Sequence, residues 1–407
     1  MHILYITQHF PPETGAAQGR AYEMAKNLVK LGNEVTVITG MPNYPEGKIY
    51  KEYKGKLYSK EEIEDVKVIR TFLVPDNKKN SLVRILNYFS FLISSIIGGL
   101  FITDVDVVYA TSPQLFVGLS GYIISLIKRA EFVLEIRDLW VDFAIHLDQL
   151  KNKFLINFSR KMENFLYEKA DKIIVVTEGF KDKIIEDGIN QSKIEVVTNG
   201  IDIEHFTPIK KDKSILNIEN IKNKFVVMYA GNIGTAQGLK VMLESAKKTK
   251  EVKDIQYVII GTGVETDKLK KYKKENNLTN VSFLGLKPKS EIANYLCSAD
   301  LLLITLKDLP FFDITIPSKV FDYMATGQPI VIGVKGEARK IVEKAGAGKY
   351  FEPENSSELA TQILNFYNGE YNINKMKINA RKYAVNNFSR YKLAQKLDNV
   401  LEKIYRE

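Results

Sequence analysis

Short apolar runs alternate with longer amphipathic stretches along the first half of the chain. The apolar runs are mostly continuous, which is typical of parallel strands covered by helices on both faces of a sheet. The strands expected from this pattern are Ile3–Gln8, Glu34–Thr39, Val66–Phe72, Val107–Ala110, Phe132–Ile136, Lys172–Thr177 and Ile194–Thr198. The expected helices are Gly19–Leu31, Leu82–Ile102, Leu115–Lys128 and Asn152–Lys169. This alternation predicts an α/β domain with a doubly wound parallel sheet.

A polar stretch, residues 201–223, interrupts the alternation and contains Pro208 and the charged run 210–213. We interpret this stretch as an interdomain linker. A second series of strands follows it, at Phe225–Ala230, Gln256–Ile260, Val281–Leu284, Leu301–Thr305 and Pro329–Ile332. The helices of this series are expected at Leu239–Lys250, Thr266–Asn276, Ser290–Ser298, Ser318–Thr326 and Ala338–Ala345, and in several pieces from 356 to 406.

The two series predict two domains, residues 1–200 and residues 224–389, because 407 residues are too many for one typical core. Open parallel sheets bind ligands beyond the carboxyl ends of their strands. We therefore expect the functional site in a cleft between the two domains, bordered by loops that follow strands.

Composition excludes several classes of protein. The single cysteine, Cys297, excludes a disulfide framework and favours a reducing compartment, and four scattered histidines show no metal-ligand spacing. The net charge of +9 suggests an anionic partner or surface, although much of it lies in lysine-rich helices such as Lys247–Lys274, where solvated faces are the simpler explanation. No zinc, helix-turn-helix or RNA-binding signature accompanies this charge, so nucleic acid is not favoured. The amino terminus shows no signal peptide, and we expect a cytoplasmic protein.

The segment Leu82–Ile102 approaches the length of a membrane span but contains Arg84, Asn87 and two glycines. Three interpretations stay open: a span, a buried core helix, or a helix lying partly in the bilayer surface. Arg84 and the preceding Lys78 and Lys79 favour contact with an anionic membrane face.

The strongest local motif lies between 316 and 333. Pro317 suits the first turn of a helix, and Ser318 and Lys319 then stand at its amino terminus, where exposed amides favour phosphate. Asp322 follows one turn later on the same side. This spacing suits a nucleoside diphosphate with its ribose. The alternative is an ordinary strand–helix–strand unit.

Small residues follow three of the expected strands and permit close approach of the backbone to an anion. The first such loop precedes a helix and contains Gly15 and Ala16, with Arg20 in that helix as a ligand or a surface charge. It does not match the dinucleotide fingerprint. The loops of the second half contain Gly231, Asn232, Gly234, Gln237, Gly261 and Gly263.

Two other loops carry polar and aromatic side chains. Asn43 and Tyr44 lie between two prolines in the loop 40–47, which predicts either an acceptor pocket or a plain turn. Arg137, Asp138 and Trp140, the only tryptophan, follow the strand that ends at 136. Charges at that position are hard to explain as core residues, so we expect a site there.

Together these segments resemble family-4 retaining glycosyltransferases of the GT-B fold over nearly the whole chain. The resemblance rests on Gln8–Ala17, Ala25–Gly40, Pro42–Gly47, Gly231–Leu239 and Pro317–Pro329. It is closest to the subgroup that adds amino sugars such as N-acetylfucosamine during bacterial O-antigen and capsule assembly.

The resemblance implies two Rossmann-like domains facing each other across a cleft, with a C-terminal helix at about 390–407 packed on the first domain. The residues implied to bind the donor are Gly15, Ala16, Arg20, Gly231, Asn232, Gly234, Gln237, Gly261, Gly263, Leu286, Ser318, Lys319 and Asp322. Asp322 would bind the ribose, and Leu286 would border the base. The chain departs from the family pattern at Ile314, Asn232 and Gln237, where charged residues are usual. Lys319, Arg20 or Lys240 would then supply the positive charge.

The implied reaction moves a sugar from a nucleoside diphosphate, expected to be UDP, to a hydroxyl of a lipid-linked saccharide, with no metal cofactor. Arg137, Asp138 and Lys319 are the expected catalytic residues, and Lys319 would stabilise the departing diphosphate. Asn43, Tyr44 and Trp140 are expected at the acceptor. The alternatives are a non-hydrolysing UDP-sugar epimerase and an inactive nucleotide-sugar-binding partner.

Overall fold

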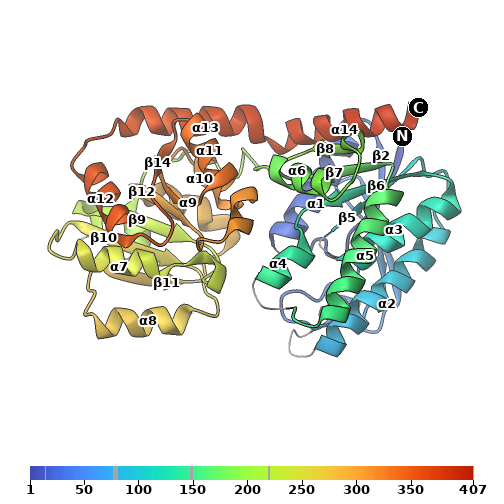
Figure 1. The fold of residues 1–407 in the computed structure, drawn as a ribbon, viewed down its shortest axis with the longest axis horizontal. Helices are drawn as coiled ribbons and strands as arrows, with labels where there is room; N and C mark the ends of the chain where they lie inside the picture. The colour runs from blue at the N-terminus through green and yellow to red at the C-terminus, as the bar shows by residue number, and fades with distance from the viewer. Residues whose placement is uncertain (14, 77–80, 113, 147–149, 219–220, 407) are drawn as a thin grey trace. The chain divides into compact units, whose positions relative to one another are not determined.

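The chain forms two compact units in the computed structural model (Figure 1), Met1–Asn199 with Arg390–Glu407, and Gly200–Ser389. The structure describes residues 1–406 except 14, 77–80, 113, 147–149 and 219–220. Lys78 and Lys79 therefore lie outside the described residues. Each unit has its own buried apolar core around a mainly parallel sheet.

The sheet of the first unit has eight strands in the order β3-β4-β2-β1-β5-β6-β7-β8. Their bounds are β1 His2–Ile6, β2 Glu34–Gly40, β3 Tyr58–Ile63, β4 Val66–Thr71, β5 Val107–Thr111, β6 Glu131–Ile136, β7 Lys172–Val175 and β8 Ile194–Val196. Apart from β3, the strands are parallel and wind outward in both directions from β1. The crevice between β1 and β5, where the winding reverses, is therefore the expected ligand-binding edge.

Strand β3 was not predicted from the sequence. Its residues are mainly polar and pair antiparallel with β4 through a turn at Glu64 and Asp65, both of which have positive φ. β3 lies at the edge of the sheet and has no fully buried residue. It therefore lacks the continuous apolar run by which the other strands were predicted.

Helices cover both faces of this sheet. They are α1 Ala16–Lys30, α2 Ser81–Leu100, α3 Leu115–Lys128, α4 Trp140–His146, α5 Lys153–Lys169, α6 Glu178–Glu186 and α14 Arg390–Arg406. Helix α14 packs against α1, with Leu397 and Leu401 buried among the residues of the first core. The end of the chain thus completes the core built by its beginning.

The second unit repeats the doubly wound plan in six parallel strands, ordered β11-β10-β9-β12-β13-β14. The strands are β9 Phe225–Ala230, β10 Ile255–Ile260, β11 Val281–Gly285, β12 Leu301–Thr305, β13 Ile330–Gly333 and β14 Gly348–Tyr350. The helices are α7 Lys240–Lys248, α8 Thr266–Glu275, α9 Ile292–Ser298, α10 Lys319–Ala325, α11 Gly336–Lys344, α12 Ser356–Tyr367 and α13 Ile373–Phe388. The winding reverses between β9 and β12, which again marks a ligand-binding edge.

The described part of residues 201–223, interpreted from the sequence as an interdomain linker, is packed on a folded unit. It belongs to the second unit, where Leu216 and Ile221 are buried. Lys211 and Lys213 both pair with Asp300, which precedes β12. The polar composition that suggested a linker instead reflects these ion pairs on the surface of the second unit.

Candidate functional site

The carboxyl end of β9 and the beginning of α10 meet in the second unit. Gly231 follows β9 with φ of +140°, and a Cβ built there would lie 2.5 Å from Cε and 2.7 Å from Nζ of Lys319. The Lys319 ammonium group therefore lies against the backbone of the Gly231 loop. Only glycine leaves room for it, because any larger residue would displace the lysine side chain.

The loop after β10 packs equally closely on the Gly231 loop. Gly261 has φ of +129°, and a Cβ there would lie 1.9 Å from the carbonyl oxygen of Gly231. A Cβ on Gly263 would lie 2.3 Å from the carbonyl oxygen of Ile233. The Ile233 N–H donates to the Thr262 carbonyl at 3.0 Å. The glycines predicted to approach a ligand are thus also required where one loop crosses the other.

The remaining predicted residues of the Gly231 loop fix its shape. The Gln237 side-chain oxygen accepts a hydrogen bond from the Gly234 N–H at 3.0 Å. The Asn232 carbonyl accepts one from the Tyr229 hydroxyl at 2.6 Å. These contacts hold the loop in one conformation beside Lys319.

Two tyrosines that the sequence did not single out position Lys319. Its Nζ lies 4.9 Å from the centre of the Tyr229 ring, within the range of a cation–π contact. The Tyr323 hydroxyl accepts from the Ala230 N–H at 2.9 Å and so fastens α10 to the end of β9. Tyr323 follows Lys319 by four residues, so the spacing of one helical turn was the available signal.

Burial gives Lys319 an unusual electrostatic state. Removal of water lowers the pKa of its ammonium group to about 8, and the nearby Asp322 carboxylate partly opposes this shift. Asp322 is partly buried on α10, while Ser318 is exposed just before the helix. A cation that loses solvation in this way interacts strongly with an incoming anion.

Leu286 lies beyond β11 with its side chain 72% exposed. The preceding Gly285 carbonyl accepts from the Gly261 N–H at 2.8 Å, so the β11 loop adjoins the β10 loop. Lys240 is paired with Glu244 at 2.9 Å on the exposed surface of α7. Lys319 is therefore the better candidate for the cation of this site.

Arg20 in the first unit occupies a buried ion pair. Its Nη2 lies 2.6 Å from Glu135 Oε1, and its Nη1 donates to the Thr198 carbonyl at 2.8 Å. The other Glu135 oxygen accepts from Thr111 Oγ1 at 2.5 Å. Although burial acts in the opposite direction, the Arg20 guanidinium holds the pKa of Glu135 below its usual value. Arg20 is thus buried and joins α1 to the ends of β6 and β8, while its expected role in donor binding stays a prediction.

The Arg137 loop lies at the carboxyl end of β6. The Arg137 N–H donates to Ser112 Oγ, just after β5, at 3.0 Å. Asp138 is exposed, and Trp140 begins α4. Gly15 is the residue before α1, and Ala16 is the first residue of α1. Both follow β1, so they lie at the same edge of the sheet as the Arg137 loop, where the parallel strands end.

A polar pocket of about 320 Å³ opens among the loops that follow β1 and β2 and the beginning of α2. Its lining residues are Gln8, His9, Asn43, Tyr44, Pro45, Gly47, Asp76, Arg84, Asn87, Tyr88 and Gln114. Asn43 and Tyr44 therefore line the same pocket, whereas Trp140 does not; the acceptor role of all three stays a prediction.

Glu13 organises this pocket although the sequence did not single it out. One buried carboxylate oxygen accepts from the Asn43 N–H at 2.7 Å and from the Tyr44 N–H at 2.8 Å. The other oxygen lies 2.9 Å from His9 Nδ1. A single carboxylate thus positions both loops of the pocket.

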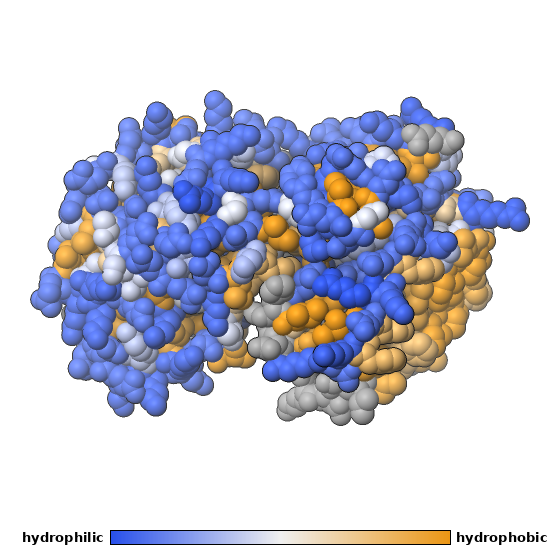
Figure 2. All heavy atoms as spheres, in the orientation of Figure 1, coloured by the Kyte–Doolittle hydropathy of each residue, from blue (hydrophilic) through white to orange (hydrophobic). Residues whose placement is uncertain are grey.

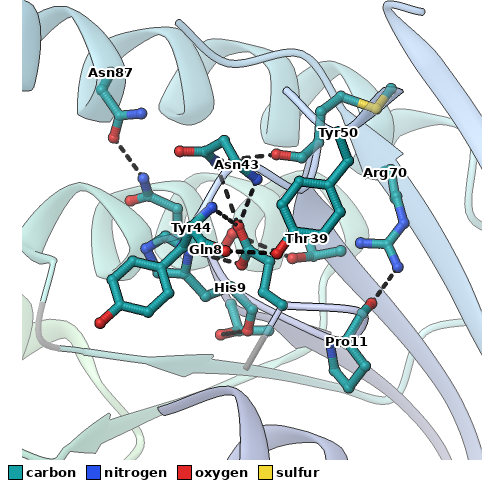
Figure 3. Close-up of polar contacts among 12 residues, drawn as sticks. Gln8, His9, Pro11, Thr39, Asn43, Tyr44, Tyr50, Arg70 and Asn87 are labelled. Atoms are coloured by element: carbon teal, nitrogen blue, oxygen red, sulfur yellow. Dashed lines mark hydrogen bonds and ion pairs between the residues drawn. The ribbon is translucent and has the colours of Figure 1, made fainter. Parts of the chain in front are cut away.

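Gln8, one of the residues that line the pocket, has one polar atom unsatisfied by the residues that the structure describes. Gln8 Nε2 donates to Asn87 Oδ1 at 2.5 Å (Figure 3). The buried Gln8 Oε1 has no hydrogen-bond partner among the described residues. Buried oxygens rarely stay unsatisfied, so a hydroxyl or amide donor from a ligand suits this position.

Metal binding has no evident place in the parts of the chain that the structure describes. They contain no group of three or more histidine, cysteine, aspartate or glutamate residues that could hold an ion.

The chain has two doubly wound units, and in each the glycine-rich or polar loops follow the strands where the winding of the sheet reverses. This architecture is the GT-B fold. Sucrose-phosphate synthase from Thermosynechococcus elongatus has this fold, with a TM-score of 0.78, 15% identity and coverage of 100% of this chain and 99% of that one. HepE of Anabaena, solved in complex with UDP and glucose, gives a TM-score of 0.72 at 18% identity, with coverage of 98% and 99%.

Two family models match consecutive parts of the chain: Glycosyltransferase Family 4 over residues 17–205, and Glycosyl transferases group 1 over residues 211–383. The chain is 25% identical to the putative colanic acid biosynthesis glycosyl transferase WcaI of Escherichia coli, over 89% of this chain and 91% of the relative. It is 26% identical to the probable glycosyltransferase WbjE of Pseudomonas aeruginosa, over 57% and 59%. The chain therefore belongs to the GT-B glycosyltransferases that combine a family-4 domain with a group-1 domain.

The contact between the two glycine loops predicts that Gly261→Ala destabilises the second unit more than Gly369→Ala. Both glycines have positive φ, and an L-residue held in such a sparsely populated backbone region is strained by about 1–3 kcal/mol. Only Gly261 adds a collision with backbone, because nothing lies within 4 Å of a Cβ at Gly369. Denaturant-dependent hydrogen exchange of amides in residues 224–389 measures the free energy of unfolding of each variant. Equal losses of this free energy in the two variants would contradict the loop contact.

Proposed function

We propose that this protein transfers a sugar from UDP to a hydroxyl of a lipid-linked saccharide during the synthesis of a cell-surface polysaccharide. The observation that carries the proposal is the Lys319 ammonium group lying against the Gly231 loop. The protein would act in the cytoplasm, at the inner face of the membrane.

The donor would be held by the second unit. Negative charge develops on the departing diphosphate during glycosyl transfer, and preorganised positive groups stabilise it. Lys319 and the loop amides supply such groups, so the proposed mechanism requires no metal ion. Asp322, one helical turn from Lys319, would accept hydrogen bonds from the ribose hydroxyls. The exposed side chain of Leu286 would pack on the base.

UDP is the proposed nucleotide for two reasons. HepE, which shares the fold, was solved with UDP and glucose. The sequence also resembles transferases of N-acetylated amino sugars, for which UDP is the expected carrier. We therefore propose an N-acetylated amino or deoxyamino sugar as the transferred group.

The acceptor would enter the polar pocket of the first unit. Saccharides present several hydroxyl donors, and the unpartnered Gln8 Oε1 can accept one of them. Asn43 and Tyr44 line the same pocket on backbone fixed by Glu13. A role in polysaccharide assembly agrees with WcaI, whose name places it in colanic acid biosynthesis.

We propose that transfer retains the anomeric configuration. Arg137 and Asp138, at the end of β6, would contact the donor sugar or the attacking hydroxyl. No side chain is assigned as a nucleophile, so the acceptor hydroxyl would attack from the face that the diphosphate leaves. In that case the departing phosphate oxygen takes the hydroxyl proton.

The first test is Lys319→Ala. Because Lys319 contacts the departing charge, the variant should lose about 100-fold or more in turnover, as is usual when one such stabilising group is removed. The variant should remain folded, because the Tyr323 hydroxyl still fastens α10 to the end of β9. Release of UDP from a panel of UDP-sugars, in the presence of a membrane lipid extract, measures turnover.

Lys271→Ala is the matched control, because Lys271 lies on α8 of the same unit with its side chain 77% exposed. The control should transfer sugar at the wild-type rate. Near-normal transfer by Lys319→Ala would exclude the proposed role of Lys319.

The lowered pKa of Lys319 predicts that donor affinity depends on pH. With the pKa near 8, the unliganded protein carries the charge below pH 8 and loses it as the pH rises. UDP should therefore bind about tenfold more weakly at pH 9 than at pH 7, because binding at pH 9 requires uptake of a proton. Isothermal titration calorimetry measures the change. Lys319→Arg should show no such dependence, and an identical profile for both proteins would contradict the assignment.

A further inference from the structure

Helix α2 exposes an apolar face. Seven large apolar side chains at its end and along one stripe are each at least 46% exposed: Ile85, Leu86, Phe89, Ile93, Ile97, Leu100 and Phe101. The stripe follows the helical period of three to four residues, so these side chains share one side of the helix. A helix on the surface of a water-soluble domain normally turns charged or polar residues to that side.

The opposite face of α2 is part of the core. Phe91 and Leu92 are buried, and Cβ atoms on Gly98 and Gly99 would lie 2.9 Å from Thr71 Cγ2 and 2.8 Å from Ile124 Cδ1. Val83–Leu100 is long and apolar enough to cross a membrane, yet 33% of it is buried in the first unit. The sequence left a span, a core helix and a surface helix open. In the structure one side of α2 packs on the first unit, while the other side is apolar and exposed.

The apolar surface extends beyond α2. A groove of about 780 Å³ lies between α2 and the β3–β4 hairpin, and its lining includes Leu57, Tyr58, Phe72, Ile93, Ile97 and Phe101. Leu126 and Ile127, at the end of α3, are also exposed. Figure 2 shows hydrophobic residues gathered at the outer edge of the first unit, in the region of α2 and α3 in Figure 1. Contiguous exposed apolar surface on a folded domain is typical of an interaction site.

Basic side chains flank this surface, while Glu61, Glu62 and Asp104 lie at its β3 end and Asp76 lies 3.5 Å from Arg84. Helices α2 and α3 contain Arg84 and Lys128 but no aspartate or glutamate. Lys128 Nζ donates to the Leu100 carbonyl at 2.9 Å, which places its charge at the end of the apolar stripe. Lys56 and Lys60 are exposed on either side of the groove residues Leu57 and Tyr58. Apolar side chains flanked by cations match the chemistry of an anionic lipid surface.

We propose that the exposed face of α2, together with the adjoining β3–β4 groove, docks onto a bilayer that contains anionic phospholipids. The apolar stripe enters the boundary between head groups and acyl chains, while Lys56, Lys60 and Lys128 contact the head groups. The helix lies along the surface, because its other face stays packed on α3 and β4.

Helix α2 also borders the polar pocket, so docking would set the position of that pocket relative to the bilayer. Arg84, Asn87 and Tyr88 line that pocket from the first turns of the same helix. A bilayer under α2 would bring the pocket to the level of the head groups, where the saccharide of a lipid-linked acceptor emerges. This last step rests on the proposed function, whereas docking itself does not.

Vesicle sedimentation of the whole chain, without nucleotide sugar, tests the proposal. Wild-type protein should sediment with vesicles of phosphatidylcholine and phosphatidylglycerol and much less with phosphatidylcholine alone. High salt should weaken the binding, because it screens the lysine charges. The double variant Ile93→Glu, Ile97→Glu should bind about tenfold more weakly, since it removes two apolar contacts and adds charges that the lipids repel.

Ile378→Glu is the matched control, because Ile378 is 67% exposed on α13 of the second unit. It should bind vesicles as the wild type does. All three proteins should bind UDP equally, so a failure of docking is separable from a failure of the proposed function. Absence of wild-type binding to anionic vesicles, or equal binding by the double variant, would overturn the proposal. A wild-type dimer that the double variant dissociates, without vesicle binding, would instead assign this face to a second copy of the chain.

Discussion

Close approach of backbone to backbone at the end of β9 is the constraint on which the candidate donor site depends. Gly231 and Gly261 lack side chains where two loops cross, and that absence lets the Lys319 ammonium group rest on the Gly231 loop. Tyr229 and Tyr323 then fix the lysine and its helix to the same strand end. The doubly wound sheet supplies the location, since its winding reverses beside β9. The contact between the two glycine loops therefore places the Lys319 ammonium group, the loop amides and the helix that carries Asp322 at one strand end.

In the first unit, buried charged side chains fix the positions of loops. Arg20 and Glu135 form a buried ion pair at β6, and the buried Glu13 carboxylate accepts hydrogen bonds from the Asn43 and Tyr44 N–H groups. A buried ion pair contributes little net stability, but removal of either partner is costly, so such pairs fix geometry. The Glu13 carboxylate therefore holds the two loops of the pocket without lining the pocket itself.

Much of the fold was predictable because apolar runs report buried parallel strands directly. All twelve strands expected from the pattern occur, whereas β3 and β14 were missed because they are short or polar strands at the sheet edges. The glycine loops and the Lys319 helix were predictable because turn chemistry and helix capping are local. The partners of Arg20 and Glu13 were not, because Glu135 and Asn43 come next to them only through the three-dimensional fold. The exposed side of α2 could not be separated from its buried side by hydropathy, since both sides are apolar.

Hydrogen exchange of the whole chain with and without UDP tests the central claim most directly. UDP should slow exchange of backbone amides in residues 229–237, 261–263 and 317–323, because these segments form the proposed diphosphate site. Lys319→Ala should lose that protection while the free protein exchanges as the wild type does. No protection by UDP, or protection confined to other segments, would contradict the account.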